Sequence, residues 1–358
     1  MGGRWLVVLL VAAALVGTPL VLLARPASSS PVTAAQLAET VRGSAALPWS
    51  GLVETSGALQ VPDSESFATL GQLLGEDNQL RVWWRGPQDW RVDRLRSTGE
   101  TDLFRSGGQQ IRWVFESDTA TVSPVGRIRL PDAVDLLPPT LARSLLQGVR
   151  DDELSRLPTA RIAGLDAAGL RITPDDPAAS LDHVDLWADP VSGLPLRVEL
   201  SGAGDRRPVV STALSRLDLS VPDQARTVFS PAGSTTVAFE DAVDVAAAAN
   251  AFAPYDLPSS LAGLPVRGED PGAVGVYGRG PTVLLAVPLR GQVARPLRER
   301  LESSAAARRT AVGTLAPVGP VSVLLTPGRS GRGAFLLAGT VTSETLEQAA
   351  TELRAVTS

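Results

Sequence analysis

Residues 80–93 read Leu80-Arg-Val-Trp-Trp-Arg-Gly-Pro-Gln-Asp-Trp-Arg-Val-Asp93, and their apolar and polar residues alternate on both sides of the Gly-Pro pair. Alternation with a period of two is typical of a half-buried β-strand, and a Gly-Pro pair marks a turn. The stretch therefore predicts two antiparallel strands joined by a short turn. Because successive side chains on a strand point to opposite faces, we expect Trp83 and Trp84 on different faces of this sheet.

Similar alternating stretches lie on both sides of this hairpin. Ile111, Trp113 and Phe115 follow a Gly-Gly turn and share one face of a further strand. Other predicted strands cover residues 49–60, 159–173, 181–188, 195–201 and 208–217. The short connections between them suit a meandering antiparallel sheet and do not suit a doubly wound parallel one.

Two helical segments interrupt the strands. Thr33 and Gln36 have the spacing of a capping box, which predicts a short helix directly after them. Residues 132–147 carry apolar residues at helical spacing, including Leu137, Leu141 and Leu145. Helices combined with an antiparallel sheet make the predicted fold class α+β.

The alternating pattern breaks near residues 230–234, and a second unit follows. It holds predicted strands near residues 273–278, 282–288, 310–315, 321–326 and 335–341, a charged helix over 293–303 and a final amphipathic helix. The predicted organisation is an N-terminal anchor and linker over residues 1–32, a large domain over 33–230, a linker over 231–245 and a small α+β domain over 246–358.

The composition excludes several classes of enzyme. All 33 basic residues of the 358 are Arg, Cys is absent, and His183 is the one His. Without Lys or Cys the chain cannot carry a P-loop lysine, a Schiff-base lysine or a catalytic thiol, and one His cannot build a His-rich metal site. A net charge of −5 also gives no case for nucleic acid as a partner. We therefore expect a non-enzyme with no catalytic residues, no metal site and no cofactor.

Residues Trp5 to Ala24 form an apolar run of 20 residues that follows Arg4 and contains no charge. This is about the length that crosses a bilayer, and it exceeds the apolar core of an ordinary signal peptide. No clean Ala-x-Ala cleavage site follows it. The sequence thus favours a single-pass membrane anchor with extracytoplasmic domains, and secretion after signal cleavage is the alternative.

Several motifs, taken together and in order, resemble exported actinobacterial proteins of the MucB/RseB type. They are Trp49-Ser-Gly51, the stretch 80–93, Gly99-Glu-Thr-Asp-Leu-Phe104, Leu136-Leu-Pro-Pro-Thr-Leu-Ala-Arg-Ser-Leu-Leu146, Ile162-Ala-Gly164, Leu170-Arg-Ile-Thr-Pro174 and Asp189-Pro-Val-Ser-Gly-Leu-Pro-Leu-Arg-Val198. The N-terminal domain of that family is similar to the lipoprotein carriers LolA and LolB. The resemblance implies a curved antiparallel sheet, an unclosed β-barrel, wrapped on helices and able to hold acyl chains on its concave side.

The same resemblance implies two kinds of partner. One is a lipid or acylated protein, which the chain carries or senses. The other is an anti-sigma factor, through which proteins of this type control envelope-stress transcription; a component of an ABC-type transporter is a further possible protein partner.

Aromatic residues gather within residues 83–115, although they make up only 4% of the chain. Two interpretations stay open: an ordinary core on one face with a partly covered surface on the other, or one face that lines an apolar cavity. The candidate lining residues for the cavity are Trp84, Trp90, Trp113, Phe115, Leu137, Leu141 and Leu145.

Charged residues supply the remaining candidates. Asp93, Glu100 and Asp102 lie close to Arg91, Arg94 and Arg96 on neighbouring predicted strands, which predicts ordinary cross-strand ion pairs. Residues 290–309 hold six Arg and two Glu. This segment is either a solvated helix face or a docking surface for an acidic partner, with Arg295, Arg298 and Arg308 as the candidate contacts.

Overall fold

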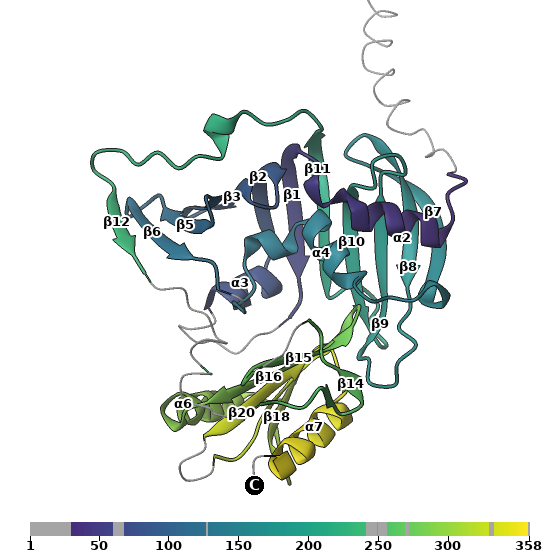
Figure 1. Ribbon diagram of the computed structural model, residues 1–358, viewed down its shortest axis with the longest axis vertical. Helices are drawn as coiled ribbons and strands as arrows, with labels where there is room; N and C mark the ends of the chain where they lie inside the picture. Colours follow the sequence, from purple (N-terminus) through teal and green to yellow (C-terminus); the bar gives the residue numbers. More distant parts are fainter. Residues whose placement is uncertain are drawn as a thin grey trace, which may run out of the picture.

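The computed structural model describes residues 30–59, 68–126, 128–240, 249, 256–268, 272–328 and 333–356, which form a large and a small domain (Figure 1). Within this part of the chain, no helix is long and apolar enough to span a bilayer. The predicted anchor from Trp5 to Ala24 lies outside the described residues.

The large domain is one twelve-stranded sheet in the order β12-β6-β5-β4-β3-β2-β1-β11-β10-β9-β8-β7. Its strands are β1 (Trp49–Gly57), β2 (Asn78–Gly86), β3 (Asp89–Arg96), β4 (Gly99–Ser106), β5 (Gln109–Val114), β6 (Thr119–Pro124), β7 (Leu154–Ile162), β8 (Leu165–Ile172), β9 (Leu181–Ala188), β10 (Pro195–Gly202), β11 (Val210–Asp218) and β12 (Thr236–Phe239). The described end strands β12 and β7 do not pair with each other, so the predicted unclosed antiparallel sheet is confirmed. β12 falls within the expected linker and pairs with β6 in parallel.

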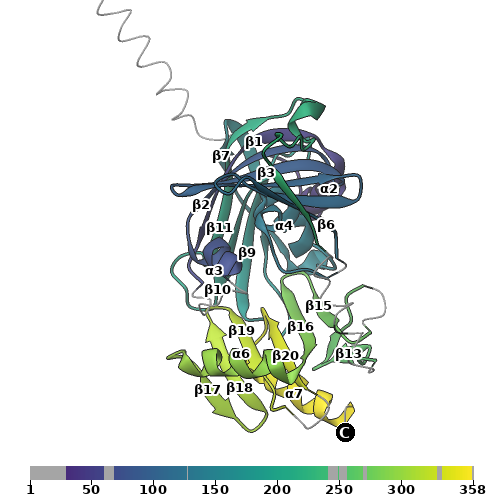
Figure 2. The same cartoon turned by 90° about the vertical axis from the view of Figure 1, so that its left-hand side faces the viewer.

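Helices cover the concave face of this sheet (Figures 1 and 2). Helix α2 (Ala34–Gly43) begins with the predicted capping box, in which the Gln36 backbone N–H donates to Thr33 Oγ1 at 3.2 Å and the Thr33 N–H donates to Gln36 Oε1 at 3.0 Å. The 3-10 helix η1 (Ser44–Ala46) leads from α2 toward β1, and α3 (Ala68–Gly75) follows β1.

The helix predicted over residues 132–147 is instead two short ones, η3 (Ala133–Leu136) and α4 (Pro138–Leu145). Leu137 between them is extended, with φ −63° and ψ 131°. A residue that precedes proline avoids the helical region because the proline ring clashes with it, and proline is well placed in the first turn of a helix. Pro138 therefore ends one helix and starts the next.

In its described residues the small domain contains a six-stranded antiparallel sheet and two helices. The sheet order is β15-β16-β20-β19-β18-β17, with β15 (Gly275–Arg279), β16 (Thr282–Leu289), β17 (Arg308–Thr310), β18 (Gly313–Val318), β19 (Val321–Leu325) and β20 (Ala334–Gly339). A two-stranded ribbon, β13 (Ser260–Leu261) and β14 (Leu264–Pro265), precedes it. The helices are α6 (Gly291–Ser303) and α7 (Ser343–Val356), and α7 buries the predicted face of Leu346, Ala349, Ala350 and Leu353.

The two domains meet near the β7–β9 end of the large sheet and at its apolar layer, against which Val318 and Val321 of the small domain pack. Arg279 of β15 forms an ion pair with Glu153, which lies in the 3-10 helix η4 (Asp151–Glu153) just before β7. Burial alone raises the pKa of Glu153, but the Arg279 hydrogen bond and two backbone N–H donors outweigh it and lower that pKa to about 2. Ala179 and Val341 add a β-bridge between the domains. The interface therefore contains a carboxylate held ionised at neutral pH.

Candidate functional site

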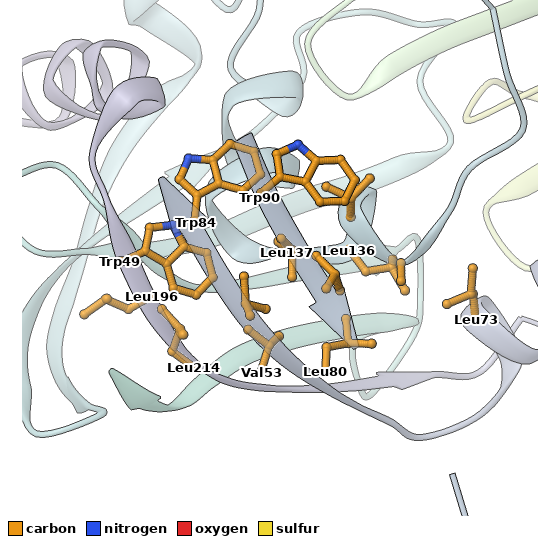
Figure 3. Close-up of a cluster of buried hydrophobic side chains, with 14 of the residues drawn as sticks. Trp49, Val53, Leu73, Leu80, Trp84, Trp90, Leu136, Leu137, Leu196 and Leu214 are labelled. Carbon is orange, nitrogen blue, oxygen red and sulfur yellow. The ribbon is translucent and has the colours of Figure 1, made fainter. Parts of the chain in front are cut away.

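The concave face of the large sheet carries a continuous apolar layer (Figure 3). Trp84 of β2 and Trp90 of β3 are directly opposite each other, and their rings stack at 6.0 Å with 4° between the planes. Each is only 5% exposed. Trp84 Nε1 donates to the carbonyl oxygen of Ala45 at 3.3 Å, which satisfies its one polar atom. Trp49, Val53, Leu80, Leu196 and Leu214 extend the layer across neighbouring strands.

Residues 132–145, which we call the plug, cover this layer with η3 and α4. Leu136 and Leu137 pack into the apolar layer, and Leu137 is fully buried. Thr212 Oγ1 of β11 donates to the Leu136 carbonyl at 2.7 Å and holds the middle of the plug to the sheet. Side chains of the plug therefore occupy the position next to the apolar layer.

Two Arg–Asp pairs hold the start of the plug. Arg129 binds Asp135 with both nitrogens, at 2.6 and 2.8 Å, and Arg112 of β5 binds Asp132. The Asp132 backbone N–H also donates to Asp135 Oδ2 at 2.7 Å. Arg112, Arg129 and Asp135 are partly exposed and Asp132 is buried, so these charge pairs form the polar contacts at the start of the plug.

Leu141 and Leu145 belong to a different apolar cluster. They lie on α4 and pack toward α2, with Leu37, Val41 and Leu146 as neighbours in that cluster. One side of α4 thus packs against α2, and the N-terminal end of α4 contacts the apolar layer.

Trp113 and Phe115 lie away from the other aromatic candidates, toward the outer face of the sheet. Trp113 of β5 is opposite Asp102 of β4, whereas the inward-pointing Leu103 is opposite Arg112. Trp113 contacts Phe115 edge-on at 5.5 Å, and Phe115 is 60% exposed. The seven candidate lining residues are thus split between the apolar layer, the α2–α4 cluster and the outer face.

The outer face of β2, β3 and β4 carries a charged cluster made of Arg81, Arg91, Asp93, Glu100 and Asp102. Arg91 binds Asp102 of the neighbouring strand β4 at 2.6 Å, so the expected cross-strand pairing of Arg91 is confirmed, and it also binds Asp93 of its own strand at 2.5 Å. Arg81 supplies the second guanidinium. Arg94, expected in the same pairs, points inward and donates to Asn78 Oδ1 at 2.9 Å.

The three carboxylates of this cluster lie close enough together to be considered as ligands of a metal ion. Asp93, Glu100 and Asp102 bring one oxygen each to within 4.8 Å of one another. However, guanidinium groups already donate to all three side chains, and two fixed positive charges in the same space repel a cation. The donor set therefore fits an ion-pair network and does not fit a resident metal. Burial and the neighbouring Asp93 raise the pKa of Asp102 to about 8.

A polar hollow of about 970 Å³ lies beside α3, where the ends of β1 to β3 approach β10 and β11. Glu54, Gln72, Arg96, Arg197 and Glu199 are among the residues that line it. No local motif marks this hollow, because its walls combine exposed strand residues with the buried Thr55 and Asn78 and come from segments far apart in the chain.

The three candidate arginines of the small domain each have a partner within the chain. Arg295 binds Glu299 one turn along α6 at 3.3 Å, Arg298 donates to the Thr326 carbonyl at 2.7 Å, and Arg308 binds Glu347 of α7 at 3.2 Å. The Arg295 side chain is 83% exposed. The structure therefore gives these residues separate local contacts and leaves Arg295 the most accessible of the three.

Comparisons with known proteins complete the description of the site. No protein-family model and no curated protein sequence matches the chain. Among solved structures, a chain of the MucA/MucB complex from Pseudomonas aeruginosa is similar at 18% identity and TM-score 0.46, over 88% of this chain and 95% of that one. A structure of MucB gives 15% identity and TM-score 0.43, over 89% of this chain and 96% of that one.

A LolA superfamily protein from Nitrosomonas europaea is similar over 55% of this chain and 98% of its own, at 14% identity and TM-score 0.26. These similar structures belong to the two groups of proteins that the sequence motifs resemble.

Proposed function

We propose that the chain is a non-catalytic protein of the cell envelope that binds a lipid or a lipidated ligand against the concave face of its large sheet, as a carrier or a sensor. The observation that carries this proposal is the continuous apolar layer around Trp84 and Trp90, which the plug covers together with Leu73 of α3 and Leu47. A ligand without polar recognition groups needs a surface of this kind and little else.

Ligand entry requires the plug to move, because Leu137 is fully buried against the layer and Trp84 and Trp90 are each only 5% exposed. Uncovering two leucines costs about 3–6 kcal/mol in lost burial. An acyl chain that takes their place gains about 0.8 kcal/mol per buried CH2, so about eight methylenes offset the loss. An acyl chain of ordinary length is therefore long enough to replace the plug.

The proposed location is the outer side of the cytoplasmic membrane, with Trp5 to Ala24 as the anchor. With no Cys in the chain, an acylated N-terminal cysteine cannot supply the attachment. The apolar run is then the membrane attachment in the proposal, and its removal tests this attachment separately from ligand binding.

Titration of residues 33–358 with a fluorescent acyl probe, followed by native mass spectrometry, tests lipid binding directly. The variant Arg112→Gln weakens the hold on the plug, and we expect it to take up the probe about tenfold more tightly than the wild type. Arg161→Gln is the matched control, since Arg161 pairs with Asp166 at 2.7 Å beyond the plug, in the β7–β8 hairpin. Absence of saturable uptake in both the wild type and Arg112→Gln contradicts the proposal.

The second candidate function is a regulatory module that binds an anti-sigma factor or a component of an ABC-type transporter. The observation in its favour is the exposure of Arg295 and Arg309, whose side chains are 83% and 80% exposed in the small domain. An acidic partner would make their contribution to binding dependent on ionic strength. Charge reversal at Arg295, Arg298 and Arg308 should abolish capture of such a partner and leave probe uptake unchanged, which separates this function from the first.

A further inference from the structure

Residues 219–235, which we call the outer strap, connect β11 to β12 along the edge of the large domain that is uppermost in Figure 1. The strap packs on aromatic side chains of the outer face. The Arg226 guanidinium lies 5.9 Å from the centre of the Trp83 ring, and Phe229 meets Phe104 edge-on at 5.3 Å. At its far end Ser234 and Thr235 donate to Asp118, at 2.8 and 2.9 Å. The strap is thus fixed by a few contacts.

The charged cluster of the outer face lies beneath these aromatic rings. Asp93 and Asp102 are directly opposite each other on β3 and β4, and both are fully buried. Arg91 reaches both carboxylates, while its guanidinium stacks at 5.1 Å on Trp83 and at 4.9 Å on Phe104. The two rings that cover Arg91 are therefore rings on which the strap rests.

The cluster holds more negative than positive charge. Three carboxylates, of Asp93, Glu100 and Asp102, face two guanidinium groups, of Arg81 and Arg91. β5 contributes the uncharged Trp113 opposite Asp102, the strap contributes Arg226 above Trp83, and Glu116 binds the backbone N–H of Glu100. Asp102 Oδ1 has no hydrogen-bond partner although it is buried. One added proton neutralises the excess negative charge. It also allows Asp102 Oδ1 to take part in a hydrogen bond.

We propose that Asp93 and Asp102 share one proton, and that this proton keeps the outer strap closed over the cluster. Two ionised carboxylates directly opposite each other in a sheet repel, and buried ones repel more strongly than exposed ones because little water screens them. Opening the strap admits water and allows both groups to ionise. The inference goes beyond the proposed function and does not depend on lipid binding.

The direction of the pH dependence follows from proton binding. The closed form holds a proton that the open form releases at an ordinary Asp pKa of about 3.9, and the raised pKa of Asp102 in the closed form is about 8. The closed form is therefore fully favoured below about pH 4 and loses this advantage as the pH rises toward 8. The opening equilibrium constant increases by at most about tenfold per pH unit within this window.

Hydrogen exchange of the full-length protein in lipid nanodiscs, measured by mass spectrometry from pH 5 to pH 8 and corrected for intrinsic exchange, tests the proposal. We expect protection of peptides from residues 219–235 to fall at least tenfold across this range in the wild type. Asp102→Asn, which is neutral at every pH, should keep strap protection constant.

Asp185→Asn is the matched control, because Asp185 is a buried carboxylate bound by Arg171 at 2.6 and 2.7 Å on β9, outside the cluster. It should reproduce the wild-type pH profile. A wild-type profile that does not change with pH, or an Asp102→Asn profile that matches the wild type, overturns the proposal.

A second measurement keeps the proposal testable if one of the variants fails to fold. The infrared C=O stretch of a protonated carboxyl should be present in the wild type at pH 6 and absent from Asp93→Asn or Asp102→Asn, whichever folds, because an uncharged side chain at either position removes the excess negative charge. Absence of that band from the wild type at pH 6 also overturns the proposal.

Discussion

The two faces of the large sheet are built from the same strands, yet they hold their side chains in different ways. On the concave face Trp84 and Trp90 stack on each other beneath helices, with no charge between them. On the outer face Trp83 is surrounded by guanidinium groups of Arg81, Arg91 and Arg226. Burial by regular helices thus permits an apolar layer, whereas burial by a single strap leaves polar groups that must satisfy one another.

The largest effect is expected from the adjacent pair of tryptophans on opposite faces. Trp84→Ala removes a 5% exposed ring from the apolar layer and should reduce the free energy of unfolding by about 3–5 kcal/mol. Trp83→Ala removes a half-buried ring and should cost about 1 kcal/mol, mainly in cation–π contacts. Urea denaturation of both variants measures the difference, and equal losses would remove the distinction between the faces.

Removal of the central cation of the outer face should have the next largest effect. Arg91→Ala leaves Asp93 and Asp102 buried with one guanidinium between three carboxylates, and we expect a loss of about 3 kcal/mol. Arg161→Ala, which removes the exposed partner of Asp166, should cost no more than about 1 kcal/mol. A small effect of Arg91→Ala on urea denaturation would mean that the cluster tolerates an excess of negative charge.

The pH dependence of global stability should also distinguish the faces. Because the pKa of Asp102 is raised to about 8 in the folded protein, the folded state binds more protons than the unfolded state between about pH 4 and pH 8. Stability should therefore fall as the pH rises through this range, by up to about 1.4 kcal/mol per unit. Asp102→Asn should flatten the curve of unfolding free energy against pH, and a curve parallel to the wild type would contradict the assignment.

The smallest effect is expected where the strap meets the sheet. Phe229→Ala deletes the edge-on contact with Phe104 and should cost about 0.5–1.5 kcal/mol. The loss should appear as faster proteolysis within residues 219–235 before any change in the circular dichroism of the sheet. Proteolysis that begins in the helices of the concave face instead would show that the strap is not less stable than those helices.

Local patterns in the sequence predict most of the fold. The alternation around residues 80–93 predicts the hairpin and the opposite faces of Trp83 and Trp84, and the capping box predicts the start of α2. These features depend on residues close together in the chain, where steric and hydrogen-bonding rules are strict. The predicted apolar face of α7 is found for the same reason.

Features that depend on distant segments are harder to predict. Trp113 shares the alternation of the earlier strands, but the register between β4 and β5 decides its face, and register is set by pairing that no local pattern encodes. The parallel pairing of β12 with β6 and the position of the strap depend on how a long connection crosses the sheet. For the candidate site, the sequence therefore identifies the aromatic residues and not the way they divide between layers.

The position of β12 has a mechanical consequence for the whole molecule. The chain leaves the large sheet at β12, on one edge, and the small domain contacts the opposite part of that sheet through Glu153 and Ala179 (Figure 1). Val318 and Val321 of the small domain also pack against the apolar layer, and Arg267 donates to the Ser144 carbonyl of α4 at 2.7 Å. Because the small domain contacts both the segment before β7 and the apolar layer, a ligand that spreads the sheet is expected to disturb the contacts of the small domain, including the Arg279–Glu153 ion pair.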